Sequence, residues 1–189
     1  CATCDGAFSR DRTVAVVGGG DAALDEALFL TRYASRVIVV HRRDRLRASA
    51  ILQERALAND KIDFVWNTVV EEVLGETEVT GARIRNVVTG ETSTLDVAAV
   101  FVFIGLTPNT GYLRGTLPMD GGGHVIVNDW METAVPGIFA AGDIRANSAR
   151  QVVTAAGDGA TAAIRADRYI SDRFDRSLSP SAEPGGIAP

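Results

Sequence analysis

The feature that most constrains the fold is a run of three glycines between a strand pattern and a helix pattern. Residues 13–17 are rich in valine and end at Gly18-Gly19-Gly20, and leucine and alanine then recur at helical spacing over residues 21–32. Residues 36–40 form a second apolar segment of strand length. The first 41 residues therefore predict a β-α-β unit with parallel strands and a right-handed crossover.

The next segments extend this sheet and then change its pattern. Residues 48–58 predict a further helix, and residues 62–66 predict a third strand. Between residues 68 and 96, alternating segments interrupted by glycines predict an antiparallel meander that lies across the first sheet. Residues 97–104 are continuously apolar, which predicts a strand that is buried on both faces.

A breaker cluster at residues 105–109 is the predicted domain boundary. Beyond it we expect brief strands at residues 125–127 and 138–141, followed by a long helix from about residue 148 to residue 174. That helix requires a sheet to cover its apolar face. The tail, residues 175–189, contains much Pro, Ser and Gly over residues 177–189 and is expected to be disordered.

The glycine run fits the G-x-G-x-x-A pattern of dinucleotide-binding turns, in the segment Gly18-Gly19-Gly20-Asp21-Ala22-Ala23. In this pattern the first glycine permits a tight turn, and the second lets the backbone approach a pyrophosphate. Ala23 allows close packing of helix on strand, and the helix N-terminus offers N–H groups to phosphates. A merely flexible glycine turn is the alternative interpretation.

The end of the second strand indicates which dinucleotide is bound. A site for NAD usually carries an acid about 20 residues after the glycines, to bind the ribose hydroxyls. This chain instead has His41-Arg42-Arg43, with Arg45 and Arg47 close behind. Guanidinium groups bind phosphate in a bidentate way, which favours the 2′-phosphate of NADP(H). The alternative is a solvated basic surface with ion pairs to Asp44 and Glu54.

Both cysteines of the chain lie in one motif, Cys1-Ala2-Thr3-Cys4. Two thiols at this spacing can open and close a small disulfide ring, which favours dithiol redox chemistry. Tetrahedral zinc needs two more ligands, and the two histidines, His41 and His124, are far apart in sequence. A structural disulfide contributes little across so short a loop. Asp5 is either a turn residue before Gly6 or an acid-base group for the thiols.

Composition excludes some classes of function. The net charge of -5 argues against a nucleic-acid binder, and the longest apolar run, residues 97–105, is too short to cross a bilayer. We see no signal peptide, and cysteines confined to one redox-type motif fit a reducing compartment, so we expect a soluble cytoplasmic protein. The chain starts at Cys1 without an initiator Met, and we expect it to be a piece of a longer protein.

Six motifs together closely resemble bacterial-type, low-molecular-weight thioredoxin reductase. They are residues 1–6, the run Gly18–Gly20, residues 41–44 with Arg47, residues 105–109, residues 136–143, and Arg150-Gln151. The resemblance covers nearly the whole chain, in the family's order and spacing. Each motif alone also occurs in other flavin disulfide reductases, including the flavoprotein reductase of the alkyl hydroperoxide system. Ala2-Thr3 between the cysteines is more typical of thioredoxin reductase.

The resemblance implies a path of electrons from NADPH to FAD, then to a Cys1–Cys4 disulfide, and then to thioredoxin or a thioredoxin-like protein. It implies that Cys4 faces the flavin, that Cys1 attacks the partner and that Asp5 is the acid-base group. The fold class is then α/β. Residues 1–106 form a Rossmann-like NADPH-binding domain with a parallel sheet and an antiparallel meander, and residues 107–174 form the C-terminal part of an FAD-binding domain.

In the second domain, the resemblance assigns Gly142 and Asp143 to the ribityl side of the flavin. It assigns Arg150, Gln151 and Val152 to the start of a helix whose N-terminus faces the flavin ring. The alternatives are an ordinary turn acid after Gly142 and ordinary first-turn residues. The family is usually a homodimer, so we expect one here.

The chain also departs from the family pattern. The family commonly has Ser or Thr at the position of Ala22, Phe at the position of Leu46 and Tyr at the position of Ala149. The N-terminal half of the flavin domain, which has its own glycine fingerprint, is absent from this sequence. An alternative function is therefore an NADP(H)-binding module without catalysis.

Overall fold

The computed structural model describes residues 2–174; Cys1 and the tail predicted to be disordered lie outside the described residues. The chain divides into two compact units, Cys1–Gly105 and Leu106–Pro189.

Unit 1 contains a parallel sheet whose strand order is β3-β2-β1-β7. Its strands are β1 (Thr13–Gly18), β2 (Arg36–Val40), β3 (Ile62–Val65) and β7 (Val100–Phe103). The crossover helices are α2 (Asp21–Leu30) and α3 (Ala50–Leu57). Strand β1 pairs in parallel with β2 on one side and with β7 on the other, so the predicted β-α-β unit is confirmed.

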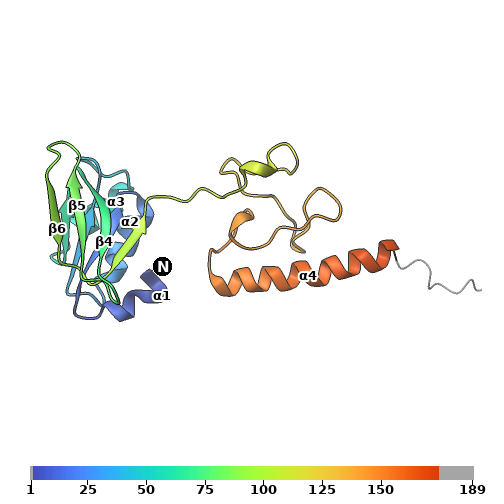
Figure 1. Ribbon diagram of the computed structural model, residues 1–189, viewed down its shortest axis with the longest axis horizontal. Coiled ribbons are helices and arrows are strands. Elements are labelled where there is room, and N and C mark those ends of the chain that lie inside the picture. The colour runs from blue at the N-terminus through green and yellow to red at the C-terminus, as the bar shows by residue number, and fades with distance from the viewer. Residues whose placement is uncertain (1, 175–189) are drawn as a thin grey trace, which may run out of the picture. The chain divides into compact units, whose positions relative to one another are not determined.

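A second sheet of three antiparallel strands follows β3 along the chain. Its strands are β4 (Thr68–Leu74), β5 (Gly81–Asn86) and β6 (Thr92–Leu95). They lie side by side in the order β4-β5-β6, as Figure 1 shows, with a register shift between Val70 and Glu72. The predicted meander is confirmed.

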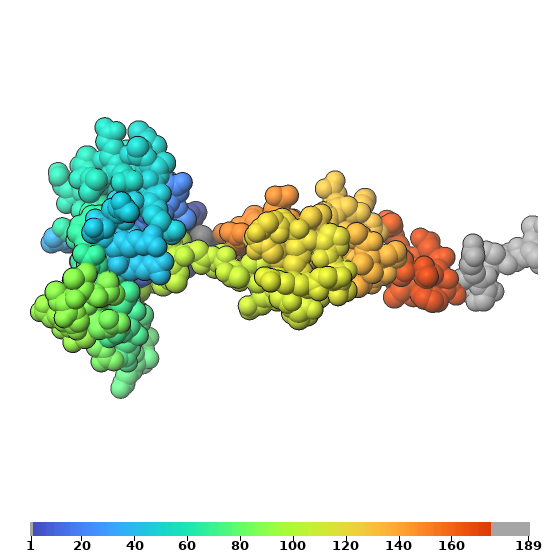
Figure 2. All heavy atoms as spheres, turned by 90° about the horizontal axis from the view of Figure 1, so that it is seen from above, coloured from blue at the N-terminus to red at the C-terminus, as the bar shows by residue number. Residues whose placement is uncertain are grey.

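Alternation along β1 places the parallel sheet between two other layers. Val14 and Val16 are fully buried against Ala23 and Leu24 of α2. Ala15, between them in sequence, faces the opposite way and packs with Ala82 of β5. The meander therefore covers the face of the sheet that the helices leave open, and its green residues form a lobe at one side of unit 1 in Figure 2. Unit 1 is an α/β domain of Rossmann type, as predicted.

The prediction that residues 97–104 form a strand buried on both faces is wrong. The strand is shorter, Val100–Phe103, and lies at the edge of the sheet. Phe101 is buried, but the side chains of Val102 and Ile104 are 58% and 69% exposed. A continuous apolar run predicts burial but does not show which face of the strand packs against another layer. Here one face of β7 is only partly covered.

Two short helical segments precede β1, namely α1 (Ala2–Asp5) and the 3-10 helix η1 (Gly6–Ser9). They follow the direction of α2. A Cβ on Gly6 would lie 3.3 Å from Leu30 and 3.4 Å from Phe29, and further along the chain the Asp11 amide donates to the Tyr33 carbonyl at 3.0 Å. Ala2 is fully buried in the same core cluster as Ala23 and Ala27 of α2. The helix that carries the cysteine motif is therefore packed along α2.

Unit 2 contains less regular structure than predicted. It has the 3-10 helices η2 (Gly111–Leu113) and η3 (Gly142–Ile144) and the long helix α4 (Val152–Phe174). The strands predicted at residues 125–127 and 138–141 are absent from the described chain, which forms only isolated bridges there, such as Val125 to Arg145 and Glu132 to Phe139. Pairing in these segments does not extend beyond single residue pairs.

Helix α4 begins at Val152, four residues later than the predicted start at residue 148. Asn147 and Arg150 have φ angles of 59° and 55°, in the left-handed region, which interrupts a right-handed helix. Much of the apolar surface of α4 is exposed, including Val152 at 89% and Val153 at 77%. Within residues 2–174, no helix combines the length and apolarity that a bilayer crossing requires.

Candidate dinucleotide and dithiol sites

The glycine turn joins β1 to α2 and has two distinct kinds of glycine. A Cβ on Gly18 would lie 2.5 Å from the Phe103 carbonyl oxygen and 2.7 Å from the Ala23 Cβ, and its φ is +152°. Only glycine fits there, because backbone and a helix residue close around it. A Cβ on Gly20 would meet nothing within 4 Å. That open space beside the first N–H groups of α2 fits the pyrophosphate of a dinucleotide.

The loop of arginines is attached to the glycine turn through backbone groups. The amides of Arg47 and Ala48 donate to the Gly19 carbonyl oxygen at 2.7 and 3.2 Å. The Ser49 amide, just before α3, donates to Asp21 Oδ1 at 2.6 Å. The turn that would bind a pyrophosphate and the loop that would bind a 2′-phosphate are therefore one connected structure.

His41 lies beneath this structure. Its imidazole is buried against Gly19, where even a Cβ would overlap the ring. Its Nε2 donates to the Arg45 carbonyl oxygen at 3.0 Å, and the ring meets Trp66 edge-on with centroids 6.3 Å apart. Burial lowers the pKa of His41, so the ring is neutral at neutral pH. His41 supports the arginine loop from below.

A cavity of about 300 Å³ opens above the turn. Five of the residues predicted to bind the nucleotide line it: Gly18, Gly19, His41, Arg42 and Arg47. The other five, Gly20, Asp21, Ala22, Ala23 and Arg43, do not line it. Ala23 is fully buried, in the packing role expected of it. Sequence analysis missed the opposite wall, which strand β4 supplies through Thr68, Val69 and Val70, because that contact depends on how the meander folds over the sheet.

The guanidinium groups around this cavity keep their charge uncompensated. Arg42, Arg43, Arg45 and Arg47 are all exposed. None of them pairs with Asp44, Glu54 or any other carboxylate in the part of the chain that the structure describes. Unpaired guanidinium groups at the mouth of a nucleotide cavity are available to a phosphate. The residues present therefore fit NADP(H).

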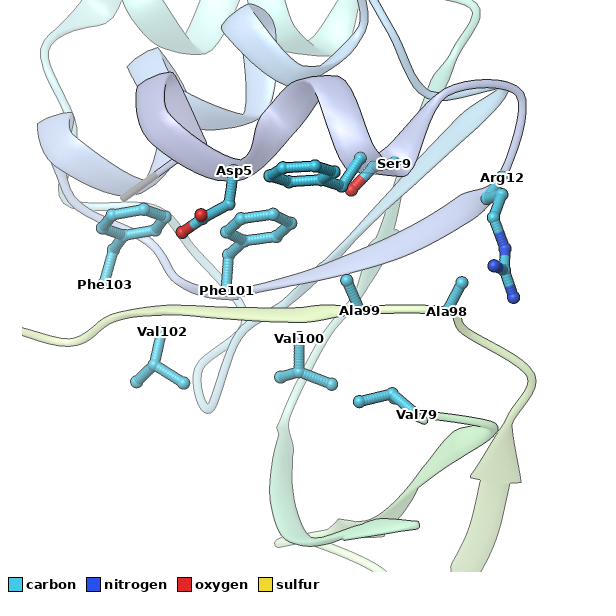
Figure 3. A pocket seen from close by; sticks show the side chains of 11 residues that line it. Asp5, Ser9, Arg12, Val79, Ala98, Ala99, Val100, Phe101, Val102 and Phe103 are labelled. Carbon is cyan, nitrogen blue, oxygen red and sulfur yellow. The ribbon is translucent and has the colours of Figure 1, made fainter. Parts of the chain in front are cut away.

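The cysteine motif lies in the same unit. Cys4 is exposed on α1, whereas its predicted disulfide partner Cys1 lies outside the described residues. Asp5 borders a hollow of about 510 Å³ between η1 and strand β7. Figure 3 shows its carboxylate directed between the rings of Phe101 and Phe103. The acid next to the second cysteine thus faces an apolar recess, which the sequence did not indicate.

Metal binding has no cluster of ligands in the described chain. Within residues 2–174, no group of three or more His, Cys, Asp or Glu side chains is arranged to hold a metal ion. His41 is occupied with Arg45, and His124 contacts Asp120 through Nδ1 at 3.3 Å.

In unit 2, Asp143 is presented by the short helix η3. The preceding residue, Gly142, has φ +77°, and its amide donates to Asp158 Oδ2 of α4 at 3.1 Å. Arg145, at the end of the same turn, donates to both oxygens of Asp158, at 2.5 and 2.8 Å. The Arg145 guanidinium holds the pKa of Asp158 below its usual range. Asp158 therefore holds the turn that carries the exposed Asp143; the sequence analysis missed it, although an acid inside an apolar helix pattern is a signal.

Arg150 and Gln151 precede α4, and Val152 is its first residue. Nη2 of Arg150 lies 3.3 Å from Nε2 of His124, whose Nδ1 contacts Asp120. The sequence offered no sign of this contact, because the two residues are 26 positions apart. Gly142, Asp143, Arg150, Gln151 and Val152 thus belong to unit 2, whereas the predicted nucleotide residues belong to unit 1.

Comparison with known proteins identifies the family. Residues 1–159 match the family model described as pyridine nucleotide-disulphide oxidoreductase, so the chain belongs to that family. Thioredoxin reductase of Listeria monocytogenes is 49% identical over 173 residues, 91% of this chain and 54% of the relative. Thioredoxin reductase of Treponema pallidum is 52% identical over 170 residues, 90% of this chain and 55% of the relative.

Solved structures agree with this result. Thioredoxin reductase from Streptococcus pyogenes superposes with a TM-score of 0.81 at 48% identity, over 91% of this chain and 56% of that one. Thioredoxin reductase from Giardia duodenalis gives a TM-score of 0.74 at 38% identity, over 90% of this chain and 57% of that one. The chain spans about half the length of the relatives it matches.

Proposed function

We propose that this chain supplies the NADP(H)-binding and redox-dithiol part of a flavin-dependent disulfide reductase that acts on thioredoxin or a thioredoxin-like protein. The observation that carries the proposal is the juxtaposition, within unit 1, of a glycine turn, unpaired guanidinium groups at its cavity and the helix with the cysteine motif. The relatives named thioredoxin reductase support the choice of protein substrate.

The residues divide the work by position. Gly20 and the N-terminus of α2 bind the pyrophosphate, while Arg42, Arg43 and Arg47 bind the 2′-phosphate. Cys1 and Cys4 form the dithiol that reduces the partner, and Asp5 exchanges a proton with it. FAD, if bound, would supply the two-electron redox chemistry between the nicotinamide and the disulfide. In unit 2, the residues proposed to hold the flavin are Gly142, Asp143, Arg150, Gln151 and Val152.

Two further properties belong to this proposal. Cysteines confined to one redox motif suit a reducing compartment, so we place the protein in the cytoplasm. We also propose a homodimer. This proposal is based on the resemblance to the family alone.

The nucleotide preference is tested by replacing two arginines together. The double variant Arg42→Ala, Arg43→Ala is expected to weaken NADPH binding about 100-fold, because charged contacts to the 2′-phosphate are lost, and to change NADH binding less than about threefold. Quenching of Trp66, which lies beside His41 of the cavity, reports binding. Arg55→Ala, an exposed arginine of α3, is the control. Equal losses for NADPH and NADH would refute the 2′-phosphate role.

A second candidate is an NADP(H)-binding module that catalyses nothing by itself. It is favoured by one observation, that the chain spans about half of its relatives' length. The purified chain is mixed with FAD, freed of excess flavin and examined by absorption. A yellow protein that bleaches when NADPH is added would exclude the module. A colourless protein that binds NADPH supports the module for this chain and leaves the reductase activity to a longer protein.

A further inference from the structure

The arginine loop, residues 42–49, ends at a side chain that the nucleotide cavity does not contain. The Ser49 amide, at the end of the loop, donates to Oδ1 of Asp21 at 2.6 Å. Asp21 is the first residue of α2, and although it follows the glycine turn directly, it does not line the cavity. Its carboxylate therefore connects the start of α2 to the end of the loop that carries the arginines.

Helix α3, which follows the loop, begins without a cap of its own. In a capping box, an acid or amide three residues after the N-cap accepts a hydrogen bond from the N-cap amide. The N-cap of α3 is Ser49, and the residue three positions later is Leu52, which has no acceptor. In the described chain the Ser49 side chain makes no cap hydrogen bond, and the first turn of α3 contains no acidic residue. Asp21 therefore supplies this acceptor and its negative charge from another helix.

The position of Asp21 would otherwise oppose the binding of a nucleotide. The N-terminus of α2 is where the pyrophosphate is proposed to bind, and a carboxylate turned toward it would repel it. Oδ1 of Asp21 is instead bonded to the Ser49 amide, outside the lining of the cavity. The bond to Ser49 makes an acid at this helix end compatible with an anion site.

The same bond fixes the geometry of the arginines. Ser49 lies two residues after Arg47, which lines the cavity. Bidentate binding of a phosphate requires a guanidinium group in a defined orientation, so a displaced loop end weakens that contact. The glycine turn serves the pyrophosphate that NADPH and NADH share, whereas the arginines serve only the 2′-phosphate. Loss of the Asp21 contact is therefore expected to change the preference between the two nucleotides.

We propose that Asp21 is a positioning residue for nucleotide preference: its carboxylate fixes the Ser49 end of the arginine loop, and through it the guanidinium groups that bind the 2′-phosphate of NADP(H). The Asp21 side chain does not contact the nucleotide. This inference rests on the proposed NADP(H) site.

The test measures the ratio of the Kd for NADH to the Kd for NADPH, on the whole chain at pH 7.5, by quenching of Trp66. Asp21→Ala removes the acceptor and is expected to lower this ratio about tenfold. Asp21→Asn keeps an oxygen that can accept from the Ser49 amide, so it is expected to stay within about threefold of the wild-type ratio. Asp25→Ala removes the same charge from an exposed position of α2 and is the control, with an unchanged ratio expected.

Removal of the donor tests the same bond from the other side. Ser49 has a φ of -58°, which proline also adopts, so Ser49→Pro deletes the N–H and keeps this φ. It is expected to lower the ratio as Asp21→Ala does. Ser49→Ala keeps the N–H and is expected to keep the wild-type ratio. The double variant D21A, S49P is expected to be no worse than either single variant, because both remove one bond.

The outcomes distinguish this inference from the proposed function. Melting temperatures are measured for every variant, and if either D21A or S49P does not fold, the other decides. A wild-type chain that prefers NADPH, together with an unchanged ratio in D21A, overturns the role of Asp21 alone. A ratio in D21N as low as in D21A also overturns it, because the bond to Ser49 is then not the cause. A wild-type chain that binds both nucleotides equally overturns both the 2′-phosphate site and the role of Asp21.

Discussion

The two units of this chain differ in how completely they bury their own apolar surface. In unit 1, helices cover one face of the parallel sheet and the meander covers the other, around residues such as Val14, Val16 and Ala15. In unit 2, the buried cluster consists of Leu117, Val125 and Ala140, and much of α4 is exposed. Unit 1 has the contacts of an independent domain, whereas unit 2 has a long amphipathic helix with one side uncovered within the described residues.

The largest expected effect is a difference in thermal stability between the two units when each is produced separately. Residues 1–105 alone are expected to fold cooperatively and to bind NADPH as tightly as the whole chain does, because the nucleotide cavity is complete within them. Residues 106–189 alone are expected to unfold at a much lower temperature than residues 1–105, because they bury less apolar surface to offset the entropy of the chain. Thermal melts followed by circular dichroism and NADPH titrations measure both. A melting temperature of residues 106–189 as high as that of residues 1–105 would contradict the comparison.

The stability of unit 2 is expected to depend more strongly on Asp158 than on any other single side chain of that unit. Asp158→Ala leaves the partly buried guanidinium of Arg145 without its partner, and we expect a loss of about 3 kcal/mol in the free energy of unfolding of unit 2. Urea unfolding followed through Trp130, the only tryptophan of unit 2, measures the loss in a Trp66→Phe background. Asp167→Asn, an exposed acid on the same helix, is the control and is expected to change stability by less than about 0.5 kcal/mol.

The same pair contributes to the loss of stability of unit 2 in acid. Because the pKa of Asp158 is lowered in the folded state, its stabilisation is fully present above the unfolded-chain value of about 3.9 and is lost as the pH falls through the folded value. The unfolding midpoint of unit 2 is therefore expected to decline below about pH 4, and Asp158→Asn is expected to reduce that dependence, with the remainder due to Asp120 and Glu132, whose pKa values their hydrogen-bond partners also lower.

Within unit 1, the two outer glycines of the turn are expected to behave differently. Gly18→Ala brings a methyl group against the Phe103 carbonyl and Ala23 at a strained φ. We therefore expect stability to fall by about 2 kcal/mol and NADPH binding to be lost as well. Gly20→Ala meets open space, so it is expected to leave the melting temperature unchanged and to weaken NADPH binding about tenfold, where the methyl group competes with the pyrophosphate. Equal melting temperatures for the two variants would remove the distinction.

The smallest expected effect is the pH response of unit 1. His41 has a lowered pKa when folded, so the unfolded chain binds the proton first as the pH falls below about 6.5. The stability of unit 1 is then expected to decline between the unfolded and folded pKa values, at a higher pH than that of unit 2. Melting temperatures from pH 7.5 to pH 5 measure this decline, and His41→Gln is expected to flatten it. A flat profile in the wild type would contradict burial of a neutral ring.

The sequence predicted unit 1 better than unit 2, for a physical reason. The strands around Gly18–Gly20 have periodic patterns, and regular pairing depends on those patterns, so both sheets were predicted. The position of β7 at the edge of the sheet was not predicted, because the composition of a strand does not specify which strands lie beside it. In unit 2, isolated bridges and left-handed residues such as Arg150 depend on contacts between distant segments.

The candidate site shows the same division. The glycines and arginines of the nucleotide turn form a recognisable local pattern, and several of them line one cavity. The wall from β4 and the support of Gly142 by Asp158 both arise from packing between segments. A single sequence contains each of these residues but does not show which distant residues they contact.

Strand β1, which is hydrogen-bonded on both sides and covered on both faces, has a consequence for hydrogen exchange. Its amides can reach solvent only when the whole sheet opens, so those that pair with β2 and β7 are expected to exchange at the rate of global unfolding. The glycine turn begins where this strand ends. The turn is therefore held by the slowest-exchanging part of the unit, and deuterium uptake in β1 would read the stabilisation that bound nucleotide adds.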